Sequence, residues 1–498
     1  MPLPSTLRGF VLRLLRLTPA LLALVALGVL VPNVAQATVT VSAKPALYPA
    51  FQRDVTDYVS RCKTGKPLVL SGTATGGEKV KVGSRPAHSG QFTESLNRNA
   101  GGGITVRVTS SSRPRTFHIR CLPSDFPKWD VSRPGKPQAQ WYVVTPIGTQ
   151  HKGYLAVFNS RAVPVWWRYA GSYGPWDAKP MPGGTIAWTH YLGDPFGQPG
   201  ASGYEEHRLD GGLVRRIRAF GVPTDTHELQ RMSNGDYLVI SYVPRTGVDL
   251  SPYGGPENAK VYDGVIQELT PAGTVKWEWR SNDHFDPSAT GRWLPILVDR
   301  ESKKPASERY YDLVHLNSVE PEGDGFVVSA RHLDAVFRIN HDGSIDWKLG
   351  GTNLPGKSLV VMNDPNGDPP IGGSHDARLW TDGSVTVFDN ETLTGRAPRA
   401  VRYAIDPLAR TATFMEEVRD SRVTQSIFGG SARKLPGGDW VVYWGGSTLV
   451  TEQTDKGAPV LSISFRNGRW GYRAAPVVPG QLSAKTLRNG MDAMSKKR

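Results

Sequence analysis

The sequence lacks several features that would assign it to common classes of protein. No long stretch has the periodicity of an amphipathic helix, which argues against a helical fold. The pattern G-x-S-x-G is absent, so a nucleophile-elbow hydrolase is not expected. Lys and Arg are scattered. The net charge of +14 therefore favours anionic partners without indicating nucleic acid.

Cysteine is equally scarce, because the chain contains only Cys62 and Cys121. In an exported protein such a pair is most simply one disulfide, which would stabilise the fold by about 4 kcal/mol. Two buried thiols are the alternative. The segment from Cys121 to Asp125 has the cysteine and proline of the sulfatase signature, but Asp125 stands where that signature needs arginine. A formylglycine sulfatase is therefore disfavoured.

The first 37 residues are typical of an export signal. Arg8, Arg13 and Arg16 precede an apolar run over residues 18–31, and Ala35-Gln36-Ala37 forms a small-x-small cleavage site. The run is short for a membrane span. We therefore predict a signal peptide over residues 1–37 and a secreted or cell-envelope location. The alternative is an uncleaved anchor, and only then would the membrane be a partner.

What is abundant is glycine, proline and tryptophan: 54, 39 and 14 residues. This composition predicts tight turns and short aromatic-rich strands, hence an all-β fold. Over residues 38–130 we expect a small β-sandwich that holds the Cys62–Cys121 disulfide. Its predicted strands cover residues 67–71, 78–82, 104–109 and 115–121. A segment rich in proline and charge, residues 125–138, is the expected linker.

A degenerate repeat begins near Trp141. Residues 271–277 match residues 341–347, and glycine turns recur roughly every fifty residues, as in a β-propeller. Five or six blades fit the length, and a β-helix is the less favoured alternative. The pattern is interrupted by two insertions, near residues 243–262 and 280–311. Residues 479–498 are polar and basic, and we expect them to be disordered.

Three histidines recur at one phase of this repeat. His227, His315 and His375 each lie eight residues ahead of a glycine that precedes an apolar strand. Because equivalent positions in a ring of repeats face the same axis, we expect the three imidazoles to converge in a central channel. The other histidines follow no such phase and are expected to be ordinary: His88, His118, His151, His190, His207, His284, His332 and His341.

Two further polar residues are expected at this channel. Strand alternation puts Asn317 on the same face as His315, and Arg331 follows a predicted strand. Imidazoles, an amide and a guanidinium would suit a tetrahedral oxyanion. Alternatively, each histidine is structural, Asn317 bonds to backbone, and Arg331 forms a salt bridge between blades. Three histidines can also hold zinc, but Arg331 would oppose a cation, so no metal is predicted.

Together these motifs resemble those of the bacterial arylsulfate sulfotransferase family. The resemblance covers roughly residues 141–478. It rests on segments that occur in order: His227 to Val239, His315-Leu316-Asn317-Ser318, Ser329-Ala330-Arg331-His332, Trp347-Lys348-Leu349-Gly350-Gly351, His375-Asp376-Ala377-Arg378 and Phe388-Asp389-Asn390. The segment around Cys121 resembles the β-sandwich domain that precedes the propeller in related secreted members.

The resemblance implies a six-bladed β-propeller over residues 131–478, with a sulfuryl-transfer site in its channel. His375 would be the nucleophile that forms a sulfohistidine, while His227, His315, Asn317 and Arg331 would hold the sulfuryl oxygens. Family enzymes move a sulfuryl group between phenols without nucleotide sulfate. The expected partners are therefore an aryl sulfate donor and a phenolic acceptor, with no cofactor and no nucleic acid. A homodimer is compatible with this interpretation.

The implied chemistry is reasonable in itself. A neutral imidazole attacks sulfur and expels a phenolate, which divides one difficult step into two. The incoming phenol needs a base, and His315 and His227 are equal candidates. Because attack requires neutral His375, activity is expected to fall below roughly pH 6.5. Two rivals stay open: a hydrolase that discharges the same intermediate to water, and a propeller that only binds anionic glycans or a protein.

Overall fold

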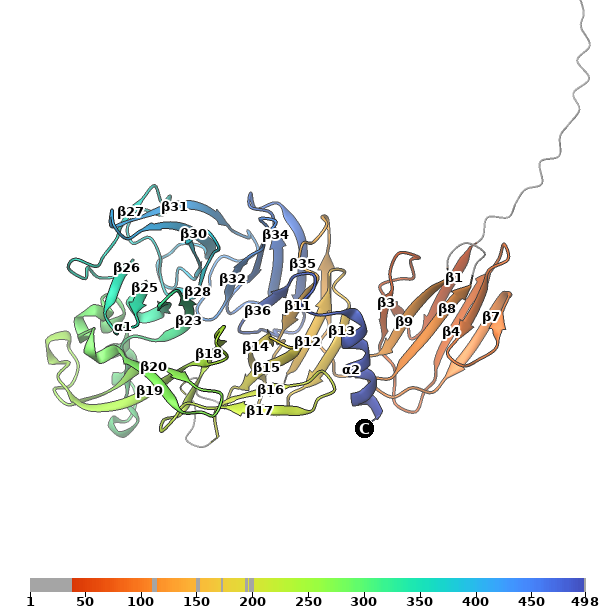
Figure 1. Cartoon of the computed structure of the whole chain (residues 1–498), viewed down its shortest axis with the longest axis horizontal. Helices are drawn as coiled ribbons and strands as arrows, with labels where there is room; N and C mark the ends of the chain where they lie inside the picture. Colours follow the sequence, from red (N-terminus) through yellow and green to blue (C-terminus); the bar gives the residue numbers. More distant parts are fainter. Residues whose placement is uncertain are drawn as a thin grey trace, which may run out of the picture.

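The computed structural model describes residues 38–109, 114–148, 153–171, 173–192, 196 and 201–496. The fold is all-β, as the composition predicts, and its strands form many separate sheets (Figure 1). The predicted export signal, residues 1–37, lies outside the described residues. Within the described ranges, no helix is both long and apolar enough to cross a membrane.

Two sheets are formed by the first part of the described chain. One has the order β1 (Val39–Lys44), β4 (Leu68–Ala74) and β7 (Gly90–Leu96). The other has the order β2 (Leu47–Tyr48), β3 (Asp57–Ser60), β9 (Arg115–Cys121), β8 (Gly103–Thr109), β5 (Lys79–Val82) and β6 (Ala87–His88). One apolar cluster from both sheets, including Val41, Leu70 and Phe117, forms the core between them.

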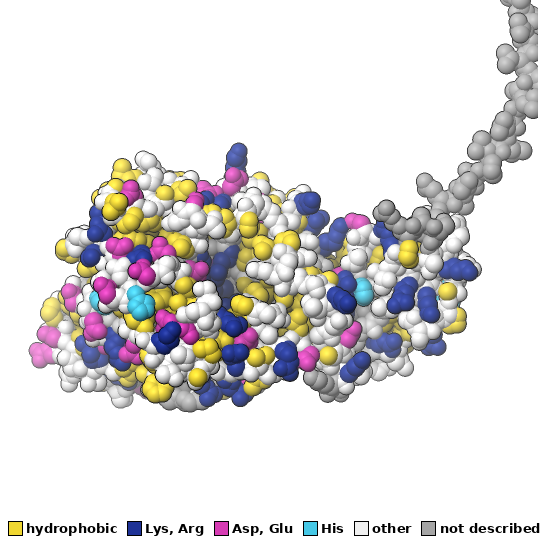
Figure 2. Space-filling view, in the orientation of Figure 1, with side chains coloured by type: hydrophobic (Ala, Val, Ile, Leu, Met, Phe, Trp, Pro, Cys, Tyr) yellow, Lys and Arg dark blue, Asp and Glu magenta, His cyan; other side chains and the backbone are white. Residues whose placement is uncertain are grey.

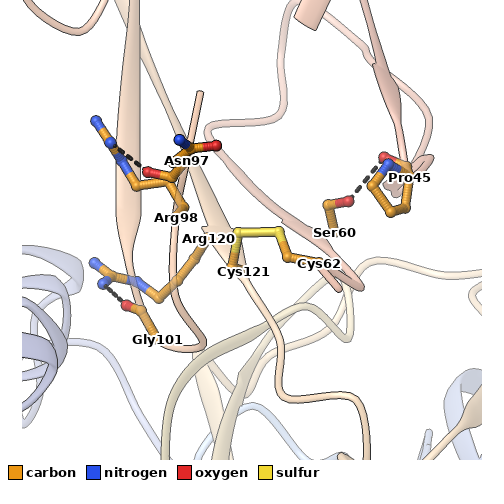
Figure 3. Close-up of a disulfide and its surroundings, with 8 residues drawn as sticks. All are labelled: Pro45, Ser60, Cys62, Asn97, Arg98, Gly101, Arg120 and Cys121. Carbon is orange, nitrogen blue, oxygen red and sulfur yellow. Dashed lines mark hydrogen bonds between the residues drawn. A yellow bond between two sulfur atoms is a disulfide. The ribbon is translucent and has the colours of Figure 1, made fainter. Parts of the chain in front are cut away.

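The two cysteines are joined in a disulfide within this core (Figure 3). Cys121 lies at the end of β9, and Cys62 follows β3, which pairs with β9 in parallel. Neighbouring polar groups are satisfied locally: Ser60 donates to the Pro45 carbonyl, and Arg120 donates to the Gly101 carbonyl. The disulfide thus connects two adjacent strands of one sheet.

The remaining strands, within the described residues, form six sheets of four or five strands along their main paths. The first sheet has the order β36 (Ala474–Val477), β11 (Trp141–Val144), β12 (Tyr154–Asn159) and β13 (Pro164–Tyr169). The second has the order β14 (Pro175–Met181), β15 (Thr185–His190), β16 (Tyr204–His207) and β17 (Leu213–Ile217). The third has the order β18 (Thr224–Arg231), β19 (Tyr237–Val248), β20 (Ala259–Leu269) and β21 (Val275–Arg280), with β22 (Tyr311–Asp312) beside β20.

The other three sheets follow in chain order. They are β23 (Leu316–Glu322), β24 (Gly325–Ala330), β25 (Ala335–Asn340) and β26 (Ile345–Leu349); β28 (His375–Leu379), β29 (Val385–Asp389), β30 (Arg399–Asp406), β31 (Thr411–Val418) and β27 (Val360–Met362); and β32 (Ser431–Lys434), β33 (Trp440–Tyr443), β34 (Leu449–Gln453), β35 (Pro459–Phe465) and β10 (Trp129–Ser132).

We call the first strand of each of these sheets its inner strand: β36, β14, β18, β23, β28 and β32. Each inner strand contacts the next, and β36 contacts both β14 and β32. The two ends of this part of the chain interlock, because β36 pairs with β11 and β10 pairs with β35. The predicted boundary between residues 130 and 131 therefore falls inside a strand, β10, that belongs to the last sheet.

The expectation of a disordered tail over residues 479–498 is wrong for its described part. Helix α2 (Ala484–Lys496) packs against β13, between the six sheets and the first two (Figure 1). Leu487 and Met491 are buried in the core beside β13. Arg488 forms an ion pair with Asp57 at 2.6 Å. The apolar face of this short helix finds a partner only in the folded chain, so its sequence alone looks merely polar.

The two predicted insertions join in one lobe beside β18–β21. The first extends the hairpin of β19 and β20 and ends in the 3₁₀ turn η2 (Ser251–Tyr253). The second contains α1 (Trp293–Ser302) with the turns η3 (Ser281–Asp283), η4 (Pro287–Thr290) and η5 (Ala306–Glu308). Leu250, Trp293 and Leu297 share one apolar core within this lobe.

Candidate functional site

Four of the five predicted polar site residues line one cavity of about 340 Å³ near the starts of the inner strands. These residues are His227, His315, Arg331 and His375. The ring centres of His227 and His315 are 4.9 Å apart, and those of His315 and His375 are 6.4 Å apart. Residues far apart in the chain therefore meet around one space, which we call the histidine cavity.

Irregularities in the inner strands accompany these histidines. Register shifts occur between Thr224 and Leu229 in β18, between Leu316 and Ser318 in β23, and between His375 and Arg378 in β28. His315 also has a positive φ of 53°. Bulges re-aim side chains that regular pleating would send elsewhere. The local backbone is thus shaped around the positions from which the imidazoles project.

Asn317 is the predicted residue that does not line the cavity. It lies at the register shift of β23, so strand alternation no longer relates it to His315. Its side-chain amide donates to the Ser374 carbonyl at 2.8 Å and accepts from the Asp376 amide at 3.3 Å. Asn317 is fully buried and connects β23 to β28, which matches the alternative of a partner for the backbone.

Carboxylates hold two of the three histidines. Nδ1 of His227 lies 2.8 and 2.9 Å from the two oxygens of Asp225. Nδ1 of His315 contacts Asp312, which belongs to β22 of the lobe. Sequence analysis missed both acids, although each precedes its histidine by two or three positions. The carboxylates fix the orientation of these imidazoles.

His375 differs because its Nδ1 has neutral partners. The ring lies 2.8 Å from Oδ1 of Asn390 and 3.0 Å from the Gly373 carbonyl. Its Nε2 accepts a hydrogen bond from the Gly429 amide at 3.2 Å. Burial lowers the pKa of His375 well below its usual value, and the positive charge of Arg331 lowers it further. The ring is therefore neutral at neutral pH.

Arg331 is positioned by groups that sequence analysis did not identify. Its guanidinium donates to Nε2 of His332 at 2.7 Å and to the Ile427 carbonyl at 2.8 Å. Trp293 from the lobe lies 4.6 Å below its Cζ. Burial lowers the pKa of Arg331 to about 10, so the group keeps its charge at neutral pH. His332, expected to be ordinary, is thus a direct partner of the cavity arginine.

The remaining walls of the cavity are mainly aromatic. Trp176 stacks between Tyr191 and Tyr472, with ring centres 4.8 Å from each, and Trp470 meets it edge-on. Phe428 and Gly429 complete the lining. Among the described residues, the buried Nε of Arg331 has no hydrogen-bond partner. The cavity therefore combines an apolar wall for a flat ring with an arginine that keeps one donor without a partner in the described part of the chain.

A metal centre made of the three cavity histidines is not supported. Within the described part of the chain, the residues whose ligand atoms lie close enough to share an ion are Asp312, His315 and His332. His332 is poorly suited to that role, because Arg331 donates to its Nε2 while its Nδ1 faces the Asp312 carbonyl at 2.6 Å. These atoms fit a chain of hydrogen bonds better than a cation site.

Beside the cavity residues, further along the inner strands, lies a buried group of charges, which we call the ion-pair cluster. All six sheets or their adjoining segments contribute to it: Asp177, Lys179, Glu228, Glu320, Asp376, Arg378, Arg433 and Arg473. Arg473 is 2% exposed and lies 2.9 Å from Asp177. A second cavity, of about 320 Å³, opens beside this cluster. Figure 2 shows Lys and Arg side chains around a hollow at the centre of the ring.

Several solved structures have a similar arrangement. They include a protein of unknown function from Bacteroides caccae, with 12% identity, coverage of 68% of this chain and 99% of that one, and a TM-score of 0.40. A catalytically inactive virginiamycin B lyase from Staphylococcus aureus has 9% identity, coverage of 68% and 88%, and a TM-score of 0.34. AztD from Citrobacter koseri has 12% identity, coverage of 68% and 98%, and a TM-score of 0.32.

No protein with a curated function matches the sequence. A family model does match: that of arylsulfotransferases (ASST), over residues 217–466. The match spans half of the chain and includes all three cavity histidines together with Arg331. It supports an enzyme of the sulfotransferase type. The chain therefore belongs to the arylsulfotransferase family.

Proposed function

We propose that this protein is an aryl sulfotransferase that uses no nucleotide sulfate and transfers the sulfuryl group through His375. The observation that carries the proposal is the histidine cavity itself. A neutral imidazole, a charged arginine and two imidazoles held by carboxylates face one space with an aromatic wall. His375 supplies the nucleophile, Arg331 supplies a positive charge for the anion, and the aromatic wall accommodates the leaving ring.

We also propose that the six sheets form a six-bladed propeller that follows a β-sandwich of residues 38 to about 128. The contacts between successive inner strands and the interlocked chain ends support this architecture. A propeller places equivalent strand positions around one axis. The disulfide supports an extracytoplasmic location, because such bonds persist in oxidising compartments.

In the first step, the lone pair of His375 Nε2 attacks the sulfur of an aryl sulfate. The N–S bond forms as the bond from sulfur to the phenolic oxygen breaks, and the phenolate leaves with that electron pair. Arg331 donates to the sulfuryl oxygens through its unused Nε. Losing one such donor typically costs about 3–4 kcal/mol in the transition state. The leaving ring rests against Trp176 and Tyr472.

In the second step, the oxygen of a phenolic acceptor attacks the same sulfur. The N–S bond breaks, its electron pair returns to Nε2, and the phenolic proton passes to a neighbouring imidazole. His227 and His315 both face the cavity, and each is held by a carboxylate that stabilises the imidazolium formed. The small-molecule partners are thus an aryl sulfate donor and a phenolic acceptor.

The environment of His375 refines the expected pH dependence. Because burial lowers the pKa of its imidazole, the neutral nucleophile persists at lower pH than in a free histidine. The acid limb of activity should therefore lie below the value near pH 6.5 expected from the sequence. A pH profile of the first step, measured under single-turnover conditions, tests this directly.

The deciding experiment is mass spectrometry of the protein quenched after exposure to 4-nitrophenyl sulfate without acceptor. We expect the mass of one sulfuryl group on the peptide that contains His375, and none in the variant H375A. The variant H341A, which changes an exposed histidine, should still be labelled. Label on another residue, or turnover by H375A, would contradict the proposal. Release of nitrophenol that needs no phenol would instead identify a hydrolase.

A further inference from the structure

We propose that Asn390 is the positioning residue that makes His375, among the three cavity histidines, the nucleophile. Its carboxamide accepts the ring proton on Nδ1 and so leaves the lone pair on Nε2, which faces the Gly429 amide at the cavity wall. This inference deepens the proposed function and rests on it. Asn390 follows β29 and is fully buried. It does not line the cavity, so it would act only through the histidine.

The hydrogen bonds of Asn390 leave one orientation for its amide. Its Nδ2 lies 2.9 Å from the Gly429 carbonyl, which can only accept. It also lies 2.7 Å from the hydroxyl oxygen of Ser426, whose proton is donated to the Gly445 carbonyl. Two acceptors therefore face this atom, so it must be the NH₂ group. The opposite atom, which faces His375, must be the carbonyl oxygen.

The tautomer of His375 follows from that orientation. Its Nδ1 faces the Asn390 oxygen and the Gly373 carbonyl, and neither can donate. Nδ1 must therefore carry the proton, so that in the neutral ring Nε2 holds the lone pair. The amide of Gly429 donates to this same Nε2. Asn390 therefore contacts both the His375 ring and Gly429, whose amide donates to Nε2 of that ring.

The contrast with the other two histidines explains the selection. Nδ1 of His227 and Nδ1 of His315 each meet a carboxylate, whereas Nδ1 of His375 meets an uncharged carboxamide. The titratable groups that face His375 are Arg331, His315, His227 and Tyr472. The positive member of this set, Arg331, opposes protonation of the ring. His375 therefore stays neutral beside partners that can take up a proton.

The test begins with ¹⁵N NMR of histidine-labelled protein, which reads the tautomer without turnover. We expect a protonated Nδ1 and an unprotonated Nε2 for His375, identified by its loss in H375A. In N390A the Gly373 carbonyl and the Gly429 amide still favour the proton on Nδ1, so we expect the same tautomer with a shifted Nδ1 resonance. A wild-type ring protonated on Nε2, or an Nδ1 resonance that is unchanged in N390A, would overturn the assignment.

Kinetics supply the second measurement. In folded N390A, kcat for 4-nitrophenyl sulfate should fall by about 10- to 100-fold, as when a partner that orients a functional histidine is lost. KM should change by less than about threefold, because the cavity walls are intact. N234A, at an exposed turn, is the matched control and should behave as wild type. Unchanged kcat in N390A would refute the inference. A wild-type protein with the Nδ1–H signal but no sulfuryl transfer would refute only the proposed function.

Discussion

The histidine cavity and the ion-pair cluster differ sharply although neighbouring residues of the same inner strands contribute to both. In β18, His227 belongs to the cavity while the next residue, Glu228, belongs to the ion-pair cluster. His375 and Asp376 divide in the same way in β28. In the cavity, buried polar atoms remain available to a ligand. In the cluster, the charges are used by one another.

This difference teaches that one ring of strands can separate chemistry from stability. A buried charge that loses its partner is costly, whereas a buried donor that awaits an anion is useful only when the anion arrives. The cluster joins all six sheets, while the cavity needs only side chains at their starts. Substitutions in the two places should therefore have different consequences, and four predictions follow from this contrast.

The largest effect is expected in the histidine cavity. The variant H375A should lose at least about 10³-fold in kcat, because it lacks the imidazole that we propose as the carrier of the sulfuryl group. Its thermal midpoint should stay close to that of the wild type, because the side chain of His375 borders a cavity and its truncation only enlarges that cavity. Turnover of 4-nitrophenyl sulfate and a melting curve measure the two quantities. A variant with a much lower melting midpoint but an unchanged kcat would contradict this prediction.

In the ion-pair cluster the variant R473M should lose stability. Removing this cation leaves Asp177, Glu228 and Asp376 without one of their partners, which typically costs about 3–5 kcal/mol. Urea unfolding gives the free energy. R466M, which breaks the exposed pair with Asp130, is the control and should have a much smaller effect. Equal midpoints for the two variants would show that the cluster does not stabilise the ring.

A smaller effect is expected for W293L, which removes the indole beneath Arg331. A desolvated cation–π contact contributes about 2 kcal/mol, so kcat/KM should fall by roughly 10- to 30-fold. W380L removes the similar contact with Arg402 outside the cavity and should leave kcat/KM near the wild-type value. If both variants lose activity equally, the lobe does not position Arg331.

The smallest effect concerns stability in acid. Burial lowers the pKa of His315, His332 and His375 below the unfolded value of about 6.5, so the unfolded state binds protons first as pH falls. Stability contributed by these neutral rings is present above pH 6.5 and is lost as pH falls toward their folded pKa values. The variant H332Q should reduce the dependence of the unfolding free energy on pH by up to about 1.4 kcal/mol per pH unit.

The cluster should respond only at lower pH. Burial alone would raise the pKa of Asp376, but the three arginines around it hold it below its usual value. Its contribution is therefore present above about pH 4 and is lost below that value. Urea unfolding of wild type and H332Q between about pH 2 and 7 measures both ranges. A parallel decline of the two proteins between about pH 4 and 7 would contradict the assignment to the buried histidines.

Much of the site could be predicted from sequence because it follows the repeat. His227, His315 and His375 share a phase, and a shared phase becomes a shared location once the sheets surround one axis. Arg331 was found because it ends a recognisable strand. The disulfide was found because two cysteines in a chain with a predicted export signal have few alternatives. Periodic signals can be read from a single sequence, and the predicted positions of the three histidines and Arg331 depend on them.

The rest depends on irregular or long-range features. Asn317 was misplaced because a register shift in β23 cannot be read from alternating residues. Trp176 and Tyr472 reach the cavity from the first and last parts of the ring, and no local pattern connects them. Helix α2 escaped notice because its apolar face is short and finds its partners at the distant strand β13. Such pairings arise only in the assembled fold.

The pairing of the final strand β36 with the early strand β11 has a consequence for biosynthesis. Trp470, Tyr472 and Arg473 lie just before β36, so the reactive pocket and the charged interior receive their last members near the end of translation. A nascent or truncated chain that stops at β35 leaves the edge of β11 open. The cavity is thereby completed only when nearly the whole polypeptide has been made.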